Sequence, residues 1–215
     1  MATLYGAGLS PFVRKVRVVL AEKKVAYDHD PVVPFNVSAE YKAISPLGKI
    51  PAYRDEKGAL PDSSVICAYL EKRHPTPALY PSDPYEYARA LWFEEYADSA
   101  LVAVVGAKIF FPRVVGPRFF NQPADEAAIG KAIAEDLPPL FDYLESQLSG
   151  DWLAGDQFSI ADVALGTQFV NMRLAGVTLD AQRWPKLARY VARVHERSSF
   201  KALIDEDRNA LGLTS

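Results

Sequence analysis

A dense group of prolines near residue 80 constrains the fold of this chain more than any other feature. Four of the sixteen prolines fall within ten residues: Pro75, Pro77, Pro81 and Pro84. Proline fixes its own φ and lacks a backbone donor, so a regular helix or strand does not continue through such a segment. Strand-like and helical runs alternate before it, whereas nearly everything after it has helical spacing. We therefore predict an α/β domain over residues 1–77, a linker over 78–86 and an all-helical domain over 87–215.

The first 77 residues contain a regular succession of short runs bounded by turn residues. Strands are predicted at Thr3–Tyr5, Val25–Val33, Pro51–Arg54 and Ala59–Pro61, and helices from Pro11 to about Lys24, from Ala39 to Ala43 and from Asp62 to about Arg73. The first strand, helix and strand return within few residues, which implies a parallel pair. The last two strands are joined by a hairpin turn ending at Gly58. The order β-α-β-α-β-β-α predicts an α/β module with a mixed four-stranded sheet.

The helix predicted to begin at Pro11 is amphipathic by its residue spacing. One face is apolar, at Phe12, Val13, Val16, Val19 and Leu20. Cations lie between these positions, and we expect them to face solvent: Arg14, Lys15, Arg17, Lys23 and Lys24. Ser10 precedes the first-turn proline and is therefore the expected N-cap.

One long helix is predicted directly after the linker. It runs from Tyr85 to about Phe111, where Pro112 ends it because proline breaks the hydrogen-bond ladder of an α-helix. Residues 113–123 contain further prolines and a glycine, and they are predicted as a loop.

Four further helical segments follow, at residues 124–148, 159–174, 184–197 and 199–204. Pro138 and Pro139 lie inside the first of these, which predicts a bend near Leu137. Ser159 and Asp162 have the spacing of a capping box at the start of the second.

The composition, with 49% hydrophobic and 24% charged residues, is typical of a soluble globular protein. A net charge of −3 gives no electrostatic basis for binding nucleic acid or an anionic membrane. The sequence has no signal-peptide pattern and no uninterrupted apolar stretch of roughly 20 residues, so no membrane span is expected. Cys67 is the only cysteine, which excludes an intramolecular disulfide and favours a reducing compartment such as the cytoplasm. Because His29, His74 and His195 lack metal-ligand spacing, no metal is expected.

Two motifs in the first domain have the features of a ligand site. If the Ile50–Pro51 peptide bond is cis, the N–H and C=O groups of Ile50 turn outward and can pair with an extended peptide. Asp62 and Ser63 present a carboxylate, a hydroxyl and free helix N–H groups, which together suit a small zwitterion. The residues alone also allow the ordinary alternative, a trans proline followed by a simple helix cap.

Several motifs together resemble the cytosolic glutathione transferase family, and the likeness covers nearly the whole chain. They are Ser10-Pro11-Phe12, Gly48-Lys49-Ile50-Pro51, Asp62-Ser63 and the capping box from Ser159 to Asp162. The run from Ser10 to Val16 is most similar to the serine-type members, such as the plant tau class, and the chain looks like a bacterial member. The resemblance implies a thioredoxin-like N-terminal domain, an all-α helical bundle and a homodimer.

The resemblance also implies roles for these residues toward glutathione, the co-substrate of the family. Ser10 is the catalytic residue and donates a hydrogen bond to the glutathione thiolate. The backbone of Ile50, held by a cis Pro51, pairs with the cysteinyl part. Asp62 binds the γ-glutamyl ammonium and Ser63 its carboxylate, while Lys49 helps neutralise the glycyl carboxylate.

The sequence departs from the family pattern at three places. Val37, in the stretch Asn36-Val37-Ser38, stands where the tau-like pattern has a lysine, so one contact to the glycyl carboxylate is in question, and the sequence leaves open whether glutathione binds more weakly. Asp62 replaces the commoner glutamate and reaches one methylene less far. Pro138 and Pro139 are atypical of the long helix in which they lie.

The resemblance implies an apolar electrophile or an organic peroxide as second substrate. Its site is expected at Phe12, Phe110, Phe111, Val114 and Phe119, with core packing as the alternative for each. Tyr5 is a rival to Ser10, since another branch of the family uses a strand tyrosine, and half-buried packing is its alternative role. Cys67 suggests thiol-transfer chemistry, but its mid-helix position favours a buried structural role. A second class of function stays open: a non-catalytic relative that binds a ligand or docks to a partner, which Val37 favours.

Overall fold

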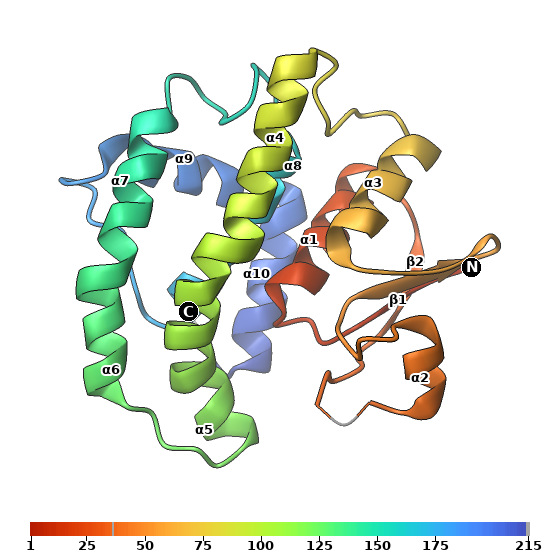
Figure 1. Cartoon of the computed structure of the whole chain (residues 1–215), viewed down its shortest axis with the longest axis horizontal. Helices are drawn as coiled ribbons and strands as arrows, with labels where there is room; N and C mark the ends of the chain where they lie inside the picture. The colour runs from red at the N-terminus through yellow and green to blue at the C-terminus, as the bar shows by residue number, and fades with distance from the viewer. Residues whose placement is uncertain (36, 214–215) are drawn as a thin grey trace.

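The computed structural model describes residues 1–35 and 37–213 and shows an α/β unit beside a larger helical unit (Figure 1). The α/β unit comprises β1 (Ala2–Tyr5), α1 (Pro11–Glu22), β2 (Tyr27–Asp30), α2 (Ala39–Ile44), β3 (Ala52–Asp55), β4 (Gly58–Pro61) and α3 (Ser63–Arg73). The helical unit comprises α4 (Pro84–Tyr96), η1 (Ala97–Val115), α5 (Gly116–Phe119), α6 (Glu126–Lys131), η2 (Ala132–Asp136), α7 (Leu137–Gln147), α8 (Ile160–Leu174), α9 (Pro185–His195) and α10 (Ser198–Ala210). Segments η1 and η2 are π-helical.

The strands form one mixed sheet in the order β2-β1-β3-β4. β1 runs parallel to β2, with Leu4 opposite His29, and antiparallel to β3, with Leu4 opposite Tyr53. β3 and β4 form the predicted hairpin. Helix α3 lies on one side of the sheet and α2 on the other (Figure 1). The topology confirms the prediction of a thioredoxin-like domain with a mixed four-stranded sheet.

The long helix after the linker extends further than predicted. α4, η1 and α5 are continuous over 36 residues, Pro84–Phe119, so the expectations that the helix ends at Phe111 and that residues 113–119 belong to a loop are wrong. Residues 120–123 lie outside the helix, as predicted. Pro112 lies inside η1. In an α-helix a proline ring clashes with the carbonyl four residues back, whereas π-helical winding bonds each N–H to the carbonyl five back. The Gly116 N–H accordingly bonds the Phe111 carbonyl, and the helix passes the proline.

A change of helical winding also accommodates the second pair of prolines. The π-helical η2 ends at Asp136, and α7 begins at Leu137, where a bend was predicted. Pro138 and Pro139 then fall in the first turn of α7. Proline is tolerated there because first-turn N–H groups have no partner inside the helix. The last helix, α10, continues to Ala210, six residues past the predicted end at Ile204.

Helix α8 lies at the centre of the molecule and is buried along nearly its whole length. Its N-terminus carries the predicted capping box, in which the Ser159 N–H donates to Asp162 Oδ2 at 2.8 Å. The helix Pro84–Phe119 is long and apolar enough to cross a membrane by length and composition alone. It packs along α8, with Leu101, Val105 and Ile109 buried, so we assign it as a core helix of the fold.

The cationic face of α1 is buried, so the expectation that its cations face solvent is wrong. Of the five, only Lys24 is exposed, whereas Arg14 and Lys15 are 1% and 0% exposed. The helical unit covers this face. Arg14 donates to Asp207 on α10 at 2.6 Å and to Asn171 on α8 at 2.8 Å.

The other two buried cations of α1 have partners as well. Arg17 makes a bidentate pair with Glu206 on α10, both distances being 2.8 Å. Lys23 pairs with Glu71 on α3 at 2.7 Å. A buried charge is tolerated when it is paired and hydrogen-bonded. Arg14 and Arg17 thus form a charged packing surface between the two units, whereas Lys23, which follows α1, pairs within the α/β unit.

Candidate functional site

The Ile50–Pro51 segment is held tightly beside the start of α1. Its peptide bond is cis. The carbonyl of Lys49 accepts hydrogen bonds from the hydroxyls of Tyr41 at 2.9 Å and Ser45 at 2.8 Å. At Gly6, with φ of +140°, a Cβ atom would lie 3.1 Å from Ile50 Cβ and 2.5 Å from a Val13 methyl. Only glycine therefore allows β1, α1 and the Ile50 backbone to approach this closely.

Asp62 and Ser63 begin α3 in direct contact with the same segment. The Asp62 N–H donates to the Pro51 carbonyl at 3.3 Å. Asp62 has φ of +75°, and its carboxylate accepts from the N–H groups of Ser64 at 2.9 Å and Val65 at 3.2 Å. Asp62 is exposed, whereas Ser63 is buried. The two motifs therefore form one continuous surface feature at the edge of the sheet.

Ser10 is the N-cap of α1, as predicted. Its Oγ accepts a hydrogen bond from the Val13 N–H at 3.4 Å. The hydroxyl is the acceptor in this bond, so its own hydrogen remains available for another acceptor. Ser10 is half-buried, and Pro11 occupies the first helical position. The residue thus combines a free hydroxyl hydrogen with the positive end of a helix dipole.

A buried lysine that sequence reasoning did not assign to the site links α1 with α3 and the long helix. Lys15 Nζ donates to Ser64 Oγ and Glu94 Oε1, both at 2.9 Å, and to Asp98 Oδ2 at 2.5 Å. Burial opposes its positive charge, but the attraction of Asp98 and Glu94 prevails and raises the pKa of Lys15. Burial raises the pKa of Asp98, which Lys15 opposes. Glu94 and Asp98 lie 79 and 83 residues further along the chain, so no local pattern indicates the cluster.

Three aromatic rings meet where the α/β unit faces the end of the long helix. The ring centroids of Phe35 and Phe120 are 4.9 Å apart, and each lies 5.9 Å from Phe111. Phe35 and Phe120 were not predicted, because one follows β2 and the other lay in the segment expected to be a loop. We call these three residues the aromatic cluster.

The other residues predicted for the hydrophobic site do not join the aromatic cluster. Phe110 and Val114 are buried in the core. Phe119 is 60% exposed, and Phe12 is half-buried after Pro11. Of the predicted set, the structure therefore places only Phe111 in the aromatic cluster, and core packing accounts for Phe110 and Val114.

Cys67 and Tyr5, the two alternatives to Ser10 as the catalytic residue, are both engaged in packing. Cys67 is fully buried in α3, and burial raises the pKa of its thiol. Tyr5 packs its half-buried ring edge-on against Tyr41, with centroids 6.2 Å apart.

Burial lowers the pKa of His195 to about 4, and its Nε2 lies 3.0 Å from the Gly166 carbonyl. Within residues 1–35 and 37–213, no group of three or more His, Cys, Asp or Glu side chains is placed to hold a metal ion.

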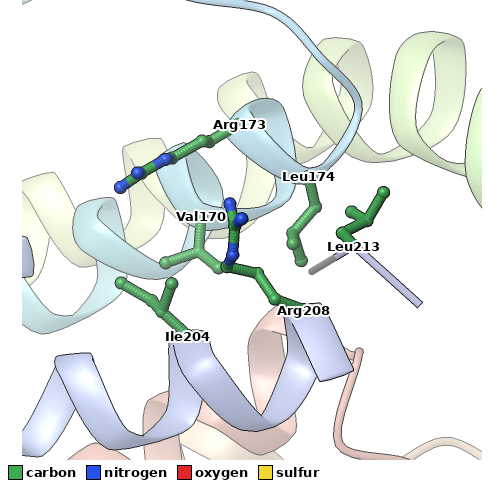
Figure 2. Close-up of a pocket in the computed structure, with 6 residues that line it drawn as sticks. All are labelled: Val170, Arg173, Leu174, Ile204, Arg208 and Leu213. Atoms are coloured by element: carbon green, nitrogen blue, oxygen red, sulfur yellow. The ribbon is translucent and has the colours of Figure 1, made fainter. Parts of the chain in front are cut away.

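Two hollows on the surface are lined by other residues than those of the three motifs. Figure 2 shows a crevice of about 20 Å³ between α8 and α10, lined by Val170, Arg173, Leu174, Ile204, Arg208 and Leu213. It has room for about one water molecule. An open hollow of about 320 Å³ beside α9 includes Asp151, Lys186 and Arg193 in its lining. Neither contains a residue of the Ser10, Ile50–Pro51 or Asp62–Ser63 motifs.

Comparison with known proteins covers both units of the chain. The family described as "Glutathione S-transferase, N-terminal domain" matches residues 4–78, and "Glutathione S-transferase, C-terminal domain" matches residues 89–193. A maleylacetoacetate isomerase from Pseudomonas aeruginosa is 32% identical over 201 residues, which cover 87% of this chain and 88% of that protein. The GST-like protein YibF from Escherichia coli is 29% identical over 202 residues, covering 92% of this chain and 95% of that one.

A solved structure shows the same likeness in three dimensions. A glutathione S-transferase from Methylobacterium radiotolerans, in complex with glutathione sulfonate, matches with a TM-score of 0.75 and 29% identity, covering 94% of each chain. The fold is thus a thioredoxin-like domain followed by a helical domain. The chain belongs to the glutathione S-transferase family.

Proposed function

We propose that this protein is a serine-type glutathione transferase that activates the thiol of glutathione for attack on an apolar electrophile. The observation that carries the proposal is the hydrogen bond from the Asp62 N–H to the Pro51 carbonyl, which joins the two ligand motifs. Gly6 brings the start of α1, and therefore the segment that carries Ser10, against Ile50. These contacts support a site in which the three motifs bind successive parts of one thiol tripeptide.

The chemistry requires a thiolate at neutral pH. A free thiol has a pKa near 8.5 and is only a few per cent ionised at about pH 7. Lowering that pKa by about two units requires roughly 2.7 kcal/mol of differential stabilisation. Ser10 contributes by donating its hydroxyl hydrogen to the sulfur, and the positive end of α1 adds to this. The thiolate then forms a carbon–sulfur bond while the leaving group departs with its electron pair. With an organic peroxide as the alternative substrate, the thiolate attacks a peroxide oxygen instead, the oxygen–oxygen bond breaks, and the alkoxide leaves with the electron pair and takes up a proton.

The remaining groups of glutathione find complementary partners along the site. The Ile50 backbone pairs with the cysteinyl part. Asp62 binds the γ-glutamyl ammonium, and Ser63 with the N-terminus of α3 binds its carboxylate. Lys49 is exposed and directly precedes Ile50, and we assign its ammonium to the glycyl carboxylate. The electrophile occupies the region of the aromatic cluster and Phe12.

We further propose the family's organisation for this chain. The two family matches, over residues 4–78 and 89–193, support a glutathione-binding domain over residues 1–77 and, after a linker over 78–86, a helical domain over 87–215 that contributes the hydrophobic site. The protein is proposed to act in the cytoplasm as a homodimer. Exposed apolar side chains on α3 and α4 supply a surface for this dimer: Val65, Leu91 and Trp92. A monomer by light scattering at micromolar concentration would contradict the dimer.

The test is conjugation of glutathione to a generic aryl halide. Wild type is expected to bind glutathione by calorimetry and to turn over, and Ser10→Ala to lose about 10²-fold or more in kcat, the scale of one positioned donor in a transition state. No glutathione binding would contradict the enzyme proposal. Full activity in Ser10→Ala would remove the Ser10 assignment alone.

A non-catalytic binding protein is the second candidate function, and Val37 is the residue that favours it. Such a protein would bind ligand without turnover in both wild type and Ser10→Ala. The same pair of measurements therefore separates the two candidates.

A further inference from the structure

We propose that the open hollow beside α9 binds a linear oligophosphate, the group that inorganic polyphosphates and nucleoside triphosphates share. The hollow belongs to the helical unit and is lined by none of the residues of the Ser10, Ile50–Pro51 and Asp62–Ser63 motifs. The site is therefore separate from the proposed thiol site, and it does not depend on transferase activity. It combines a row of cations, a loop with unpartnered backbone N–H groups and a fixed frame.

Three cations of α9 line the hollow along one face of the helix. Lys186, Arg189 and Arg193 are spaced at i, i+3 and i+7, so they share a face and extend over about 10 Å of the helix axis. Lys186 and Arg189 are exposed, and neither side chain has a carboxylate partner among the described residues. Like charges at this spacing repel one another on a helix. An anion with several charges over a similar length would neutralise the row.

The nearby carboxylates leave most of this charge unneutralised. Among the described residues that line the hollow, Asp151 is the single acid, and it pairs with Arg193 at 2.7 Å. Glu145 on α7 accepts hydrogen bonds from the N–H groups of Lys186 at 3.1 Å and Leu187 at 2.8 Å. Because Glu145 already caps the first turn of α9, the attraction for an anion comes from the side chains of the row and not from the helix end.

The loop after α7 supplies backbone donors to the same hollow. Ser149, Gly150 and Asp151 line it, and within residues 1–35 and 37–213 their N–H groups donate to no protein acceptor. Ser149 and Gly150 are exposed, and a Cβ built at Gly150 would meet no atom within 4 Å. An anion can therefore approach the loop closely. Backbone N–H groups together with arginine and lysine are a recurring set of donors for phosphate oxygens.

The frame of the hollow is fixed by hydrogen bonds on both sides. Arg193 donates to the Asp151 carbonyl at 2.9 Å as well as to its carboxylate, which ties the loop to α9. Asp142 on α7 accepts from Trp184 Nε1 at 2.6 Å directly before α9 begins. A preformed site lowers the cost of ordering on binding. The volume of about 320 Å³ lies at the lower end of the roughly 300–1,000 Å³ of small-molecule sites, which suits a compact polyanion.

Calorimetry of the full chain tests the site with tripolyphosphate as the probe. At about 0.15 M salt we expect a Kd below about 1 mM, and inorganic phosphate to bind at least about tenfold more weakly. ATP without Mg²⁺ distinguishes the two sources of the group: equal affinity assigns the phosphate chain alone, and tighter binding of ATP assigns a nucleotide. A Kd for tripolyphosphate above about 1 mM, or equal binding of phosphate, would overturn the inference. Tighter binding of a single-stranded oligothymidylate would assign this face to nucleic acid and also overturn it.

Substitutions along the row locate the site. Lys186→Gln and Arg189→Gln keep helix-forming side chains and should each weaken tripolyphosphate binding about fivefold, and together about 20-fold. Asp151→Asn removes the one acid that opposes the anion and should tighten binding about threefold. Lys201→Gln is the matched control, since Lys201 is exposed on α10 and lies outside the lining, and it should change nothing. Wild-type affinity in the double variant, with circular dichroism unchanged, would contradict the site.

Competition with glutathione separates this site from the proposed thiol site. The affinity for tripolyphosphate should be the same with and without glutathione at high concentration, and the same in Ser10→Ala. Displacement of tripolyphosphate by glutathione would assign the anion to the thiol site and overturn the inference. A protein that binds tripolyphosphate at the α9 row but neither binds nor conjugates glutathione would overturn the transferase proposal and support this one.

Discussion

Among the described residues, two of the contacts between the α/β unit and the helical unit differ in chemistry and depth. The contact along α1 is ionic and buried: Arg14 and Lys15 are at most 1% exposed and bond carboxylates of the helical unit. The aromatic cluster at the other contact is apolar and more open, with Phe35 48% and Phe120 38% exposed. One contact is bound by directional charge-assisted bonds, the other by adaptable ring packing.

The difference matches what each contact supports. The ionic contact lies on the helix that begins at Ser10 and, through Lys15, reaches Ser64 beside the γ-glutamyl subsite. In our account, it fixes the groups that position the thiol. The aromatic cluster lies where we place the electrophile, and rings that are half exposed can repack around flat apolar molecules. Rigidity is thus concentrated where one substrate is constant, and adaptability where the other varies.

The largest expected effect comes from removing the buried ammonium. Lys15→Met keeps side-chain length but leaves Glu94 and Asp98 without their cation, which should lower the free energy of unfolding by about 3–5 kcal/mol. Lys108→Met is the matched control, because Lys108 pairs with Asp136 on the surface and its loss should cost less than about 1 kcal/mol. Urea unfolding measures both. Equal effects would mean that the α1 contact is not the rigid one.

An intermediate effect is expected at the aromatic cluster. Phe35→Ala removes ring contacts worth about 0.5–1.5 kcal/mol, and we expect KM for an aryl electrophile to rise several-fold with KM for glutathione unchanged. Phe119→Ala is the control, because Phe119 is exposed and outside the cluster. Steady-state kinetics with each substrate varied in turn gives the two KM values separately. An unchanged electrophile KM in Phe35→Ala would separate the aromatic cluster from substrate binding.

The smallest expected effect is a pH dependence of the free energy of unfolding, and it arises from the Arg17–Glu206 pair of the ionic contact. The hydrogen bonds from Arg17 hold the pKa of Glu206 below its ordinary value of 4.5. A lowered folded-state pKa adds stability above the unfolded pKa, and this stability is lost as the pH falls through the folded one. Because Glu206 is about half exposed, we expect less than about 1 kcal/mol.

Comparing the unfolding free energies of wild type and Glu206→Gln from pH 7 to pH 3 tests this. The difference between the two proteins should shrink as the pH falls below about 4.5. A constant difference would show that the carboxylate charge contributes nothing. The Phe35→Ala difference should be independent of pH over the same range.

Local sequence signals were sufficient for most elements of the α/β unit. The Ser10 cap, the hairpin at Gly58 and the Asp62 cap each depend on residues within one turn, and the structure has all three. The capping box at Ser159 belongs to the same kind of signal. Each fixes backbone geometry through short-range hydrogen bonds, so neighbouring residues alone determine it.

The failures have a common physical cause. Helical spacing shows which residues of α1 share a face, but not that another unit covers the charged one, and Arg14 meets Asp207 across 193 residues. Pro112 was treated as a helix end because the rule assumes α-helical winding. The aromatic cluster joins Phe35 to Phe111 and Phe120 across the two units, and no local pattern encodes that meeting.

The most direct test of the proposed mechanism is the ionisation of bound glutathione. Thiolate absorbance in the ultraviolet, followed against pH at saturating glutathione, gives the pKa of the bound thiol in wild type and in Ser10→Ala. We expect the pKa of the bound thiol in wild type to lie about two units below the free-thiol value, which is near 8.5. In Ser10→Ala it should return toward the free value. A bound thiol that titrates like free glutathione in the wild-type protein would contradict the proposed mechanism.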